Sequence, residues 1–322
     1  MSKNENITLA LDCGSTNLKA ALFDAQLHCI ARGSVPVTYS AADGVIAELD
    51  PAQLWQSTVD LIRQTCRDAA IASPQIDTLA LTSQAQTFAL LDPSGSPLTP
   101  FISWLDTRAE VEAAFLKEKL GPDFHRHSSF AYPLAGLQLA NLLWLHRHAP
   151  QKLAQTACII PLPSWLTLQL AGVAAIDTNL AAMSGLYSMP LRDWWPPALE
   201  LCGVTPQQMP ALVAMGTPIP AVKTSPDLPL SPHLKIVFAG NDHTAGAYAN
   251  HCRQGTVIAT LGTALVAYRF AGSRPGPFHP QGAWGFYPFG GFYELASRAY
   301  GCIALDWACD CLFPGSEISS FL

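Results

Sequence analysis

Charged side chains are scarce in this sequence of 322 residues: Lys, Arg, Asp and Glu together make up 13%, roughly half of the usual share. A disordered chain needs high charge and few apolar residues, whereas 49% of the residues here are apolar, so a disordered protein is excluded. The 18 basic residues are outnumbered by 24 acidic ones, the net charge is −6, and no basic run occurs. Because binding to phosphate backbones needs many cations, we expect no nucleic-acid partner.

Long apolar runs and a targeting segment are also missing. The most apolar stretch, residues 159–172, is shorter than the ~20 residues of a membrane span, and Pro161 and Pro163 break it. The amino terminus leads directly into a strand pattern rather than into the apolar region of a signal peptide. The number of cysteines, nine, is odd, which indicates reduced thiols rather than a disulfide framework. We therefore expect a cytoplasmic protein with no membrane partner, and the sequence leaves a homodimer open.

Short apolar runs alternate with helical patterns, which predicts an α/β fold. The runs expected as strands are 7–11, 20–23, 28–32, 76–82, 88–91, 234–238, 256–261 and 265–270. Asp50 followed by Pro51 predicts the start of a capped helix, and its apolar stripe consists of Leu54, Val59, Ile62 and Cys66. Further helices are expected over 134–148 and 304–312, and a change of composition near 243–255 predicts a domain boundary.

The turn between the first two expected strands carries a carboxylate, a glycine, three short polar residues and a lysine. These residues are Asp12, Gly14, Ser15, Thr16, Asn17 and Lys19. Consecutive N–H groups in such a turn form a concavity for an anion, and phosphate is a natural guest. The carboxylate would hold a hydrated Mg²⁺ against that phosphate, because Mg²⁺ takes few protein ligands. A tight polar turn with a solvated lysine explains the same residues equally well.

A second hairpin has a similar turn, in which Gly262 and Thr263 connect the strands expected at 256–261 and 265–270. The two hairpins give a weak indication of an internal repeat. Neither G-x-x-x-x-G-K-[ST] nor a G-x-G-x-x-G that opens a helix occurs, which argues against the P-loop and Rossmann classes.

A single acidic residue, Asp242, follows the strand expected at 234–238, in the segment Gly240-Asn241-Asp242-His243. An aspartate at the end of a strand is most often the cap of the next helix. In a catalytic role it would be a general base that takes a proton from an alcohol attacking phosphorus. The residues alone leave both interpretations open.

Polar residues in apolar surroundings form a third candidate site. They are Gln84, Gln86, Trp104, Asp106 and Arg108. Amide, carboxylate and guanidinium groups bind hydroxyls, and an indole stacks on C–H faces, so this set predicts a polyhydroxylated ligand. A surface loop with an ion pair between Asp106 and Arg108 is the alternative.

Taken together and in this order, the motifs resemble those of the FGGY carbohydrate kinases, which belong to the actin-like ATPase superfamily. Asp12-x-Gly14-Ser15-Thr16-x-x-Lys19 is similar to the first phosphate motif of that family, and Thr260-Leu261-Gly262-Thr263 to the second. Trp104-x-Asp106-x-Arg108 falls where the family binds sugar, and Gly240-Asn241-Asp242 where it carries its catalytic aspartate. The resemblance is collinear over nearly the whole chain.

The resemblance implies RNase-H-like domains: a complete amino-terminal domain for sugar and phosphate over residues 1–244, and the beginning of a nucleotide-binding domain over 245–322. It implies ATP-dependent phosphorylation of a hydroxyl of a small sugar or polyol, with ATP and Mg²⁺ as cofactors. Asp242 would be the general base and contact the substrate, and Asp12 would organise the metal. The implied phosphate ligands are Gly14, Ser15, Thr16, Asn17, Lys19, Gly262 and Thr263, and the implied sugar ligands are Gln84, Gln86, Trp104, Asp106 and Arg108.

Three features depart from the family pattern. Asn141 stands where the first signature usually has a lysine, and Ala85-Gln86 replaces the Arg-Glu of glycerol kinases and the Met-His of xylulose kinases. The chain also ends at Leu322, before the family's adenosine-binding segment. We therefore retain two alternatives: a catalytically inactive sugar-binding fragment, and a sensor that binds nucleotide without turnover.

Overall fold

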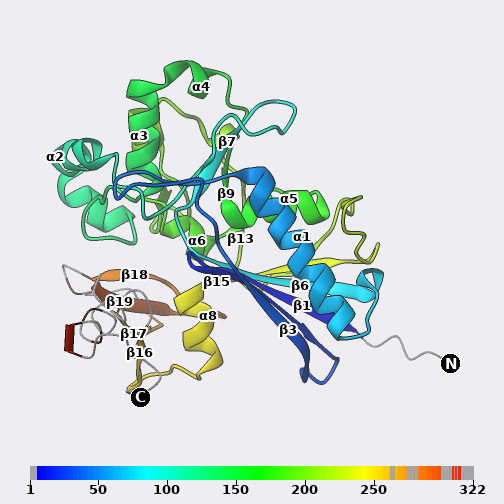
Figure 1. Ribbon diagram of the computed structural model, residues 1–322. Coiled ribbons are helices and arrows are strands. Elements are labelled where there is room, and N and C mark those ends of the chain that lie inside the picture. Colours follow the sequence, from blue (N-terminus) through cyan, green and yellow to red (C-terminus); the bar gives the residue numbers. More distant parts are fainter. Residues whose placement is uncertain are drawn as a thin grey trace. The chain divides into compact units, whose positions relative to one another are not determined.

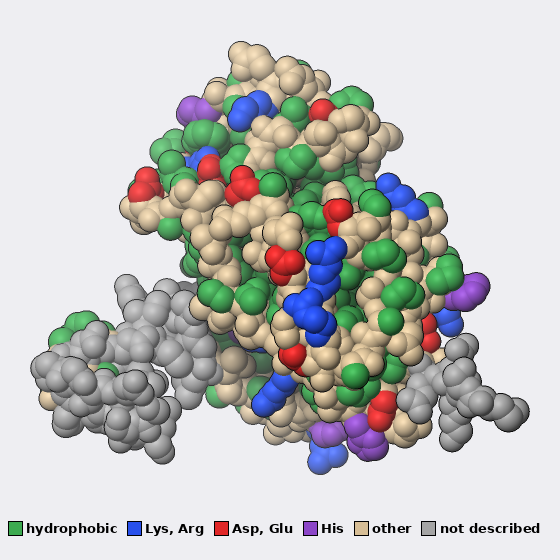
Figure 2. Space-filling model, turned by 45° about the vertical axis from the view of Figure 1, so that its right-hand side comes forward, with side chains coloured by type: hydrophobic (Ala, Val, Ile, Leu, Met, Phe, Trp, Pro, Cys, Tyr) green, Lys and Arg blue, Asp and Glu red, His purple; other side chains and the backbone are tan. Residues whose placement is uncertain are grey.

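The computed structural model describes residues 6–261, 265–273, 279, 282–298, 307, 309 and 311–312. The chain divides into two compact units, Met1–Asp242 and His243–Leu322, and each unit is described by itself. None of the described helices combines the length and the apolarity needed to cross a bilayer. On the face drawn in Figure 2, Lys and Arg side chains lie close to Asp and Glu side chains and do not form one extended basic area.

The first unit contains most of the helices and strands. Its strands are β1 (Ile7–Cys13), β2 (Asn17–Phe23), β3 (Cys29–Pro36), β4 (Ala41–Ala42), β5 (Ala47–Leu49), β6 (Ile76–Ser83), β7 (Phe88–Leu91), β8 (Phe101–Ile102), β9 (Cys158–Pro161), β10 (Ala175–Asp177), β11 (Tyr187–Ser188), β12 (Asp193–Trp194), β13 (Ala211–Val213), β14 (Ile219–Pro220) and β15 (Lys235–Asn241). Its helices are α1 (Pro51–Asp68), η1 (Ser73–Gln75), α2 (Glu110–His127), α3 (Gln138–His148), α4 (Pro150–Ala154), α5 (Leu162–Ala171), α6 (Thr178–Ala182), α7 (Pro196–Leu201) and η2 (Pro206–Gln208). The α/β fold predicted from the alternating pattern is confirmed.

A six-stranded sheet forms the centre of this unit, with the order β14-β15-β6-β1-β2-β3 (Figure 1). The strands β1, β6 and β15 are parallel, whereas β2 and β3 run antiparallel to their neighbours. Side chains of β1 alternate between buried and half-buried positions, as expected for a strand in the middle of a sheet. A second sheet, with the order β4-β5-β8-β7-β9, lies in the same unit.

Helix α1 begins where the sequence predicted it. The carboxylate of Asp50 accepts a hydrogen bond of 2.8 Å from the backbone N–H of Gln53, and Pro51 is the first helical residue. The predicted apolar stripe is buried, and the helix packs on β2 and β3, as Figure 1 shows. Its members are Leu54, Val59, Ile62 and Cys66. Local capping and periodicity therefore determine this helix.

Helix α3 differs from the prediction, because it begins at Gln138 and not at residue 134. Gly136 lies against the backbone of Trp104, where a Cβ atom on residue 136 would come within 2.1 Å of the Trp104 carbonyl oxygen. The segment before α3 therefore turns onto the Trp104 loop, and the backbone N–H of Leu137 closes a turn to the carbonyl of Leu134. A contact between residues far apart in sequence overrides the local helical pattern here.

The second unit contains an antiparallel sheet with the order β16-β17-β19-β18. Its elements are β16 (Val257–Leu261), β17 (Leu265–Gly272), β18 (Ala283–Phe286), β19 (Phe292–Arg298) and helix α8 (Asp242–Ala249), which begins with the last residue of the first unit. The predicted hairpin at 256–270 is confirmed. Its turn residues Gly262 and Thr263 lie outside the described residues, as does most of the helix expected at 304–312.

Candidate functional site

The carboxyl ends of three parallel strands meet at one edge of the main sheet, and the candidate residues of the first unit follow from this register. Cys13 of β1 pairs with Ser83 of β6, and Ser83 also pairs with Asn241 of β15. The turn after β1, the segment after β6 and Asp242 after β15 therefore leave the sheet at the same edge. Such edges are where open α/β sheets commonly bind ligands.

The turn after β1 is tight and closely packed. The backbone N–H of Gly14 donates to the carbonyl oxygen of Asn17 at 3.1 Å, and a Cβ atom on Gly14 would come within 2.9 Å of the same oxygen. The turn therefore needs a glycine at this position. Tyr39 donates from its hydroxyl to the carbonyl oxygen of Ser15 at 3.0 Å, which fixes the turn from outside.

Asp12 lies in β1, directly before this turn, and its two carboxylate oxygens have different surroundings. The Oδ2 atom accepts a hydrogen bond of 3.2 Å from Nζ of Lys19, its neighbour across the hairpin. The Oδ1 atom is buried and has no hydrogen-bond partner among the described residues. Burial raises the pKa of Asp12, Lys19 opposes that rise, and the negative charge of Asp242 adds to it.

Asp242 is the first residue of α8 and its side chain is exposed. The register of β1, β6 and β15 places Asp242, directly after Asn241, at the sheet edge where β1 ends, one residue after Asp12. The fold thus brings to one sheet edge two acidic residues that lie far apart in the sequence. Their catalytic roles remain predictions.

A chain of hydrogen bonds connects the turn after β1 to the predicted sugar segment. The amide nitrogen of Gln84 donates to the carbonyl oxygen of Gly14 at 3.0 Å, and its amide oxygen accepts from the hydroxyl of Thr87 at 2.9 Å. The same hydroxyl lies 3.3 Å from the backbone nitrogen of Trp104, which donates to it. Gln86, between these residues, is half-buried and has a positive φ of 73°, a conformation that costs free energy and is often found at functional sites.

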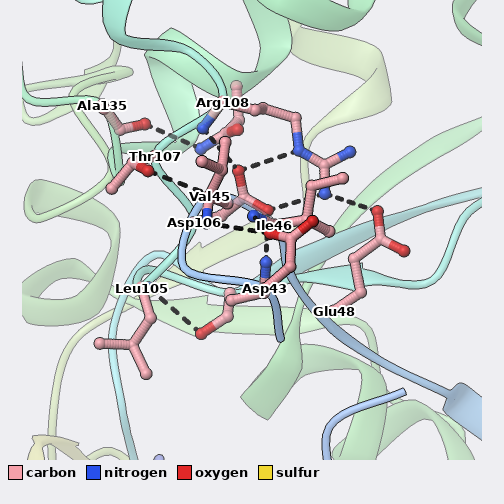
Figure 3. Close-up of polar contacts among 12 residues, drawn as sticks. Asp43, Val45, Ile46, Glu48, Leu105, Asp106, Thr107, Arg108 and Ala135 are labelled. Atoms are coloured by element: carbon pink, nitrogen blue, oxygen red, sulfur yellow. Dashed lines mark hydrogen bonds and ion pairs between the residues drawn. The ribbon is translucent and has the colours of Figure 1, made fainter. Parts of the chain in front are cut away.

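The pair Asp106 and Arg108 forms a buried network, shown in Figure 3. Asp106 is 0% exposed, and it accepts hydrogen bonds from the backbone N–H of Ala47 at 2.8 Å and from the guanidinium of Arg108 at 2.7 and 2.9 Å. Arg108 also bonds to Glu48 and lies over the ring of Trp144 at 5.2 Å. Burial lowers the pKa of Arg108, but the bonds with Asp106 and Glu48 outweigh that effect and the pKa is raised.

This network corrects the picture of an exposed ion pair on a surface loop. Both oxygens of Asp106 already accept hydrogen bonds from the protein, so its observed role is to hold the start of β5 against the segment after β8. Sugar contacts by Asp106 and Arg108 stay predictions. The half-buried Trp104 is two residues away and depends on the position of this segment.

Sequence reasoning assigned no site role to the polar residues around the end of β15. Asp177 and Asn179 lie at the start of α6, and the Oδ1 atom of Asn179 accepts hydrogen bonds from Asn241. An aspartate followed by a short helical stretch indicates a cap, which could have identified Asp177. No local pattern identifies the contact of Asn179, because its partner is 62 residues away.

Comparison with solved structures identifies the class of fold. The xylulose kinase from Rhodospirillum rubrum superposes with a TM-score of 0.88 over 98% of this chain and 65% of that chain, at 22% sequence identity. The chain therefore has the actin-like ATPase fold of this solved structure.

The family follows from the sequence match. The model of the "FGGY family of carbohydrate kinases, N-terminal domain" matches residues 7–248, and this chain belongs to that family. A xylulose kinase of Streptomyces rubiginosus is 26% identical over 271 residues, which cover 84% of this chain and 55% of that protein. An autoinducer-2 kinase of Klebsiella pneumoniae is 31% identical over 221 residues, which cover 66% of this chain and 41% of that protein. The chain thus spans about half the length of these curated relatives.

Proposed function

We propose that the protein phosphorylates a hydroxyl of a small sugar or polyol with ATP, and that Asp242 is the general base. The observation that carries the proposal is the approach of Asp12 and Asp242 at one sheet edge, next to the closely packed turn after β1. Family membership supports the reaction class, because the curated relatives are named as sugar or autoinducer-2 kinases. Such a reaction uses cytoplasmic ATP, which fits the expected location.

Asp242 would act on the sugar hydroxyl that accepts the phosphoryl group, and the turn after β1 would act on the phosphate groups of ATP. The exposed carboxylate of Asp242 would accept the proton of the attacking hydroxyl, which raises the nucleophilicity of that oxygen as the bond to phosphorus forms. The backbone N–H groups that follow Gly14 in this turn, with the ammonium of Lys19, would bind phosphate oxygens, because the N–H of Gly14 itself already donates to Asn17. Trp104 and Gln86 would orient the sugar.

The surroundings of Asp12 fit a magnesium ion. Its Oδ1 atom is a buried carboxylate oxygen without a partner among the described residues, and carboxylate oxygens with water are the ligands that Mg²⁺ prefers. When bound, Mg²⁺ neutralises charge on the phosphate groups during transfer. Asp12 would hold the hydrated ion, and Lys19, which bonds to Oδ2, would keep the carboxylate oriented.

The substrate is proposed only as a class. Ala85 and Gln86 stand where the glycerol and xylulose kinase patterns have other residues, so neither substrate is assigned. A sugar-binding chain without phosphoryl transfer is the second candidate, because the residues predicted to bind sugar lie in the described part of the first unit, whereas Gly262 and Thr263 of the second predicted phosphate turn lie outside the described residues.

The test combines ADP release with calorimetry of sugar binding. We expect ADP release with at least one member of a panel of ketoses and polyols. Asp242→Asn keeps the size of the side chain and should lower kcat by roughly 10²- to 10⁴-fold, the usual contribution of a general base, while sugar binding persists. A variant with wild-type turnover would reassign the base. Sugar binding by the wild-type chain without any ADP release would favour the second candidate.

A further inference from the structure

The end of β15 contains a bulge directly before Asp242. Phe238 pairs with Leu81 of β6, and Asn241 pairs with Ser83, so β15 uses one more residue than β6 over the same distance. Gly240 lies in the bulge with a positive φ of 77°. Bulges bend a strand and redirect the residues that follow, and they are common beside active sites. The direction in which Asp242 leaves the sheet therefore depends on this bulge.

The bulge is held from two sides by side chains of other elements. On one side, the hydroxyl of Thr82 in β6 donates to the carbonyl oxygen of Gly240 at 2.9 Å. On the other side, the Oδ1 atom of Asn179 accepts hydrogen bonds from the backbone nitrogen of Asn241 at 3.0 Å and from its side-chain Nδ2 at 2.7 Å. Asn179 is thus a buried acceptor for both donors of the residue that precedes Asp242.

Asn179 is itself held in place by its neighbours. Asp177 caps α6 and accepts hydrogen bonds from the backbone nitrogens of Asn179 at 2.8 Å and Leu180 at 3.1 Å. A Cβ atom on Gly240 would come within 3.0 Å of the Asn179 amide oxygen and 2.7 Å of the sulfur of Met215. The fit between α6 and the bulge is therefore close, and a shift of Asn179 would be transmitted to Asn241.

We propose that Asn179 is a positioning residue for Asp242: its amide oxygen holds the bulge of β15 in the geometry that directs Asp242 to the edge where Asp12 lies. The inference rests on the proposed function, in which Asp242 is the base. Whether Asn179 determines the position of Asp242 can nevertheless be tested without measuring turnover. Asn179 belongs to α6, and it acts through Asn241 and not on the substrate.

The test compares three variants of the whole chain by crystallography and kinetics. Asn179→Ala removes the acceptor, and Asn179→Asp keeps an oxygen in its place. Thr167→Val is the control: it removes a buried hydroxyl that donates to the carbonyl oxygens of Ser164 and Val173, within and beside α5 and away from the bulge. In Asn179→Ala we expect the Asn241–Ser83 register to be lost and the Asp242 carboxylate to move by about 1 Å, a displacement that costs ~100-fold in rate.

The kinetic signature separates positioning from general loss of stability. In Asn179→Ala, kcat and kcat/KM for the sugar should fall together, because the interaction that is lost acts in the transition state. Asn179→Asp should recover a large part of kcat, and Thr167→Val should keep the kcat of the wild type. If Asn179→Ala does not fold, Asn241→Ala removes the side-chain bond alone, with a smaller loss of the same kind.

Two results would overturn the inference: an unmoved Asp242 in the Asn179→Ala structure, or a kcat equal to that of the wild type. Failure of the proposed function gives a different result. If the wild-type chain releases no ADP with any sugar, the kinase proposal fails, and the crystal structures alone still decide whether Asn179 places Asp242.

Discussion

The buried network around Arg108 allows a prediction of stability that the structure can quantify. Arg108→Met keeps most of the length of the side chain and removes its charge. Asp106, which is 0% exposed, then loses the two guanidinium bonds and keeps those from backbone nitrogens, and Glu48 loses its bond to the guanidinium. Removing one partner of a buried pair costs about 3 to 5 kcal/mol, because it leaves a charge without compensation.

We expect the lower end of that range, about 3 kcal/mol, because the backbone donors to Asp106 remain and the Arg108 side chain is 12% exposed. For a folded unit of this size, 1 kcal/mol corresponds to roughly 2 to 4 °C, so the thermal midpoint should fall by roughly 6 to 12 °C. Differential scanning calorimetry with tryptophan fluorescence would measure it.

The matched control is Arg126→Met. Arg126 forms an ion pair with Asp123 at 2.8 Å, but its side chain is 69% exposed and that of Asp123 is 62% exposed. Exposed pairs contribute at most about 1 kcal/mol, so this variant should stay close to the wild type. Equal thermal midpoints for the two variants would refute the claim that the buried Arg108 network contributes more to stability than an exposed ion pair does.

Two further predictions concern the segment proposed to bind sugar and the pH dependence of stability. Gly136→Ala places a Cβ atom 2.1 Å from the Trp104 carbonyl oxygen; this overpacking costs about 1 to 3 kcal/mol and should weaken sugar binding, measured by calorimetry, about 10-fold. The control is Gly246→Ala, whose Cβ atom would have no atom within 4 Å and which should leave the affinity unchanged. Equal sugar affinities for the two variants would mean that Trp104 does not contact the sugar. Burial raises the pKa of Asp177 to about 6 from 3.8, so between these values the folded state binds more protons than the unfolded state and stability falls as the pH rises. Urea denaturation from pH 4 to 7 should show this decline in the wild type relative to Asp177→Asn, and parallel curves for the two proteins would contradict it.

Local signals in the sequence predicted much of the first unit. Helix α1 follows from Asp50, Pro51 and an apolar stripe, all within one stretch of chain. Strand β7 has the predicted bounds, 88–91. The β1–β2 hairpin was expected because its glycine-containing turn separates two apolar runs. In each case the interactions that determine the element lie within a few residues.

Contacts between distant residues account for the features that the sequence did not predict. The ion pair of Asp106 and Arg108 is visible as a short spacing, but its burial depends on Ala47 and Glu48, which are about 60 positions away. The bonds from Asn241 to Asn179 have no local pattern at all. The approach of Asp12 to Asp242 was predicted through the family resemblance, because spacing alone does not place the two residues at one sheet edge.

A double-mutant cycle of Asp12→Asn and Asp242→Asn, measured as kcat for ADP release, tests the central claim most directly. If both carboxylates act in one transition state, either substitution alone should remove most of the catalysis. The kcat of the double variant should then be only slightly lower than that of the less active single variant. Additive losses in the double variant would show that the two residues act independently, and would contradict a shared site.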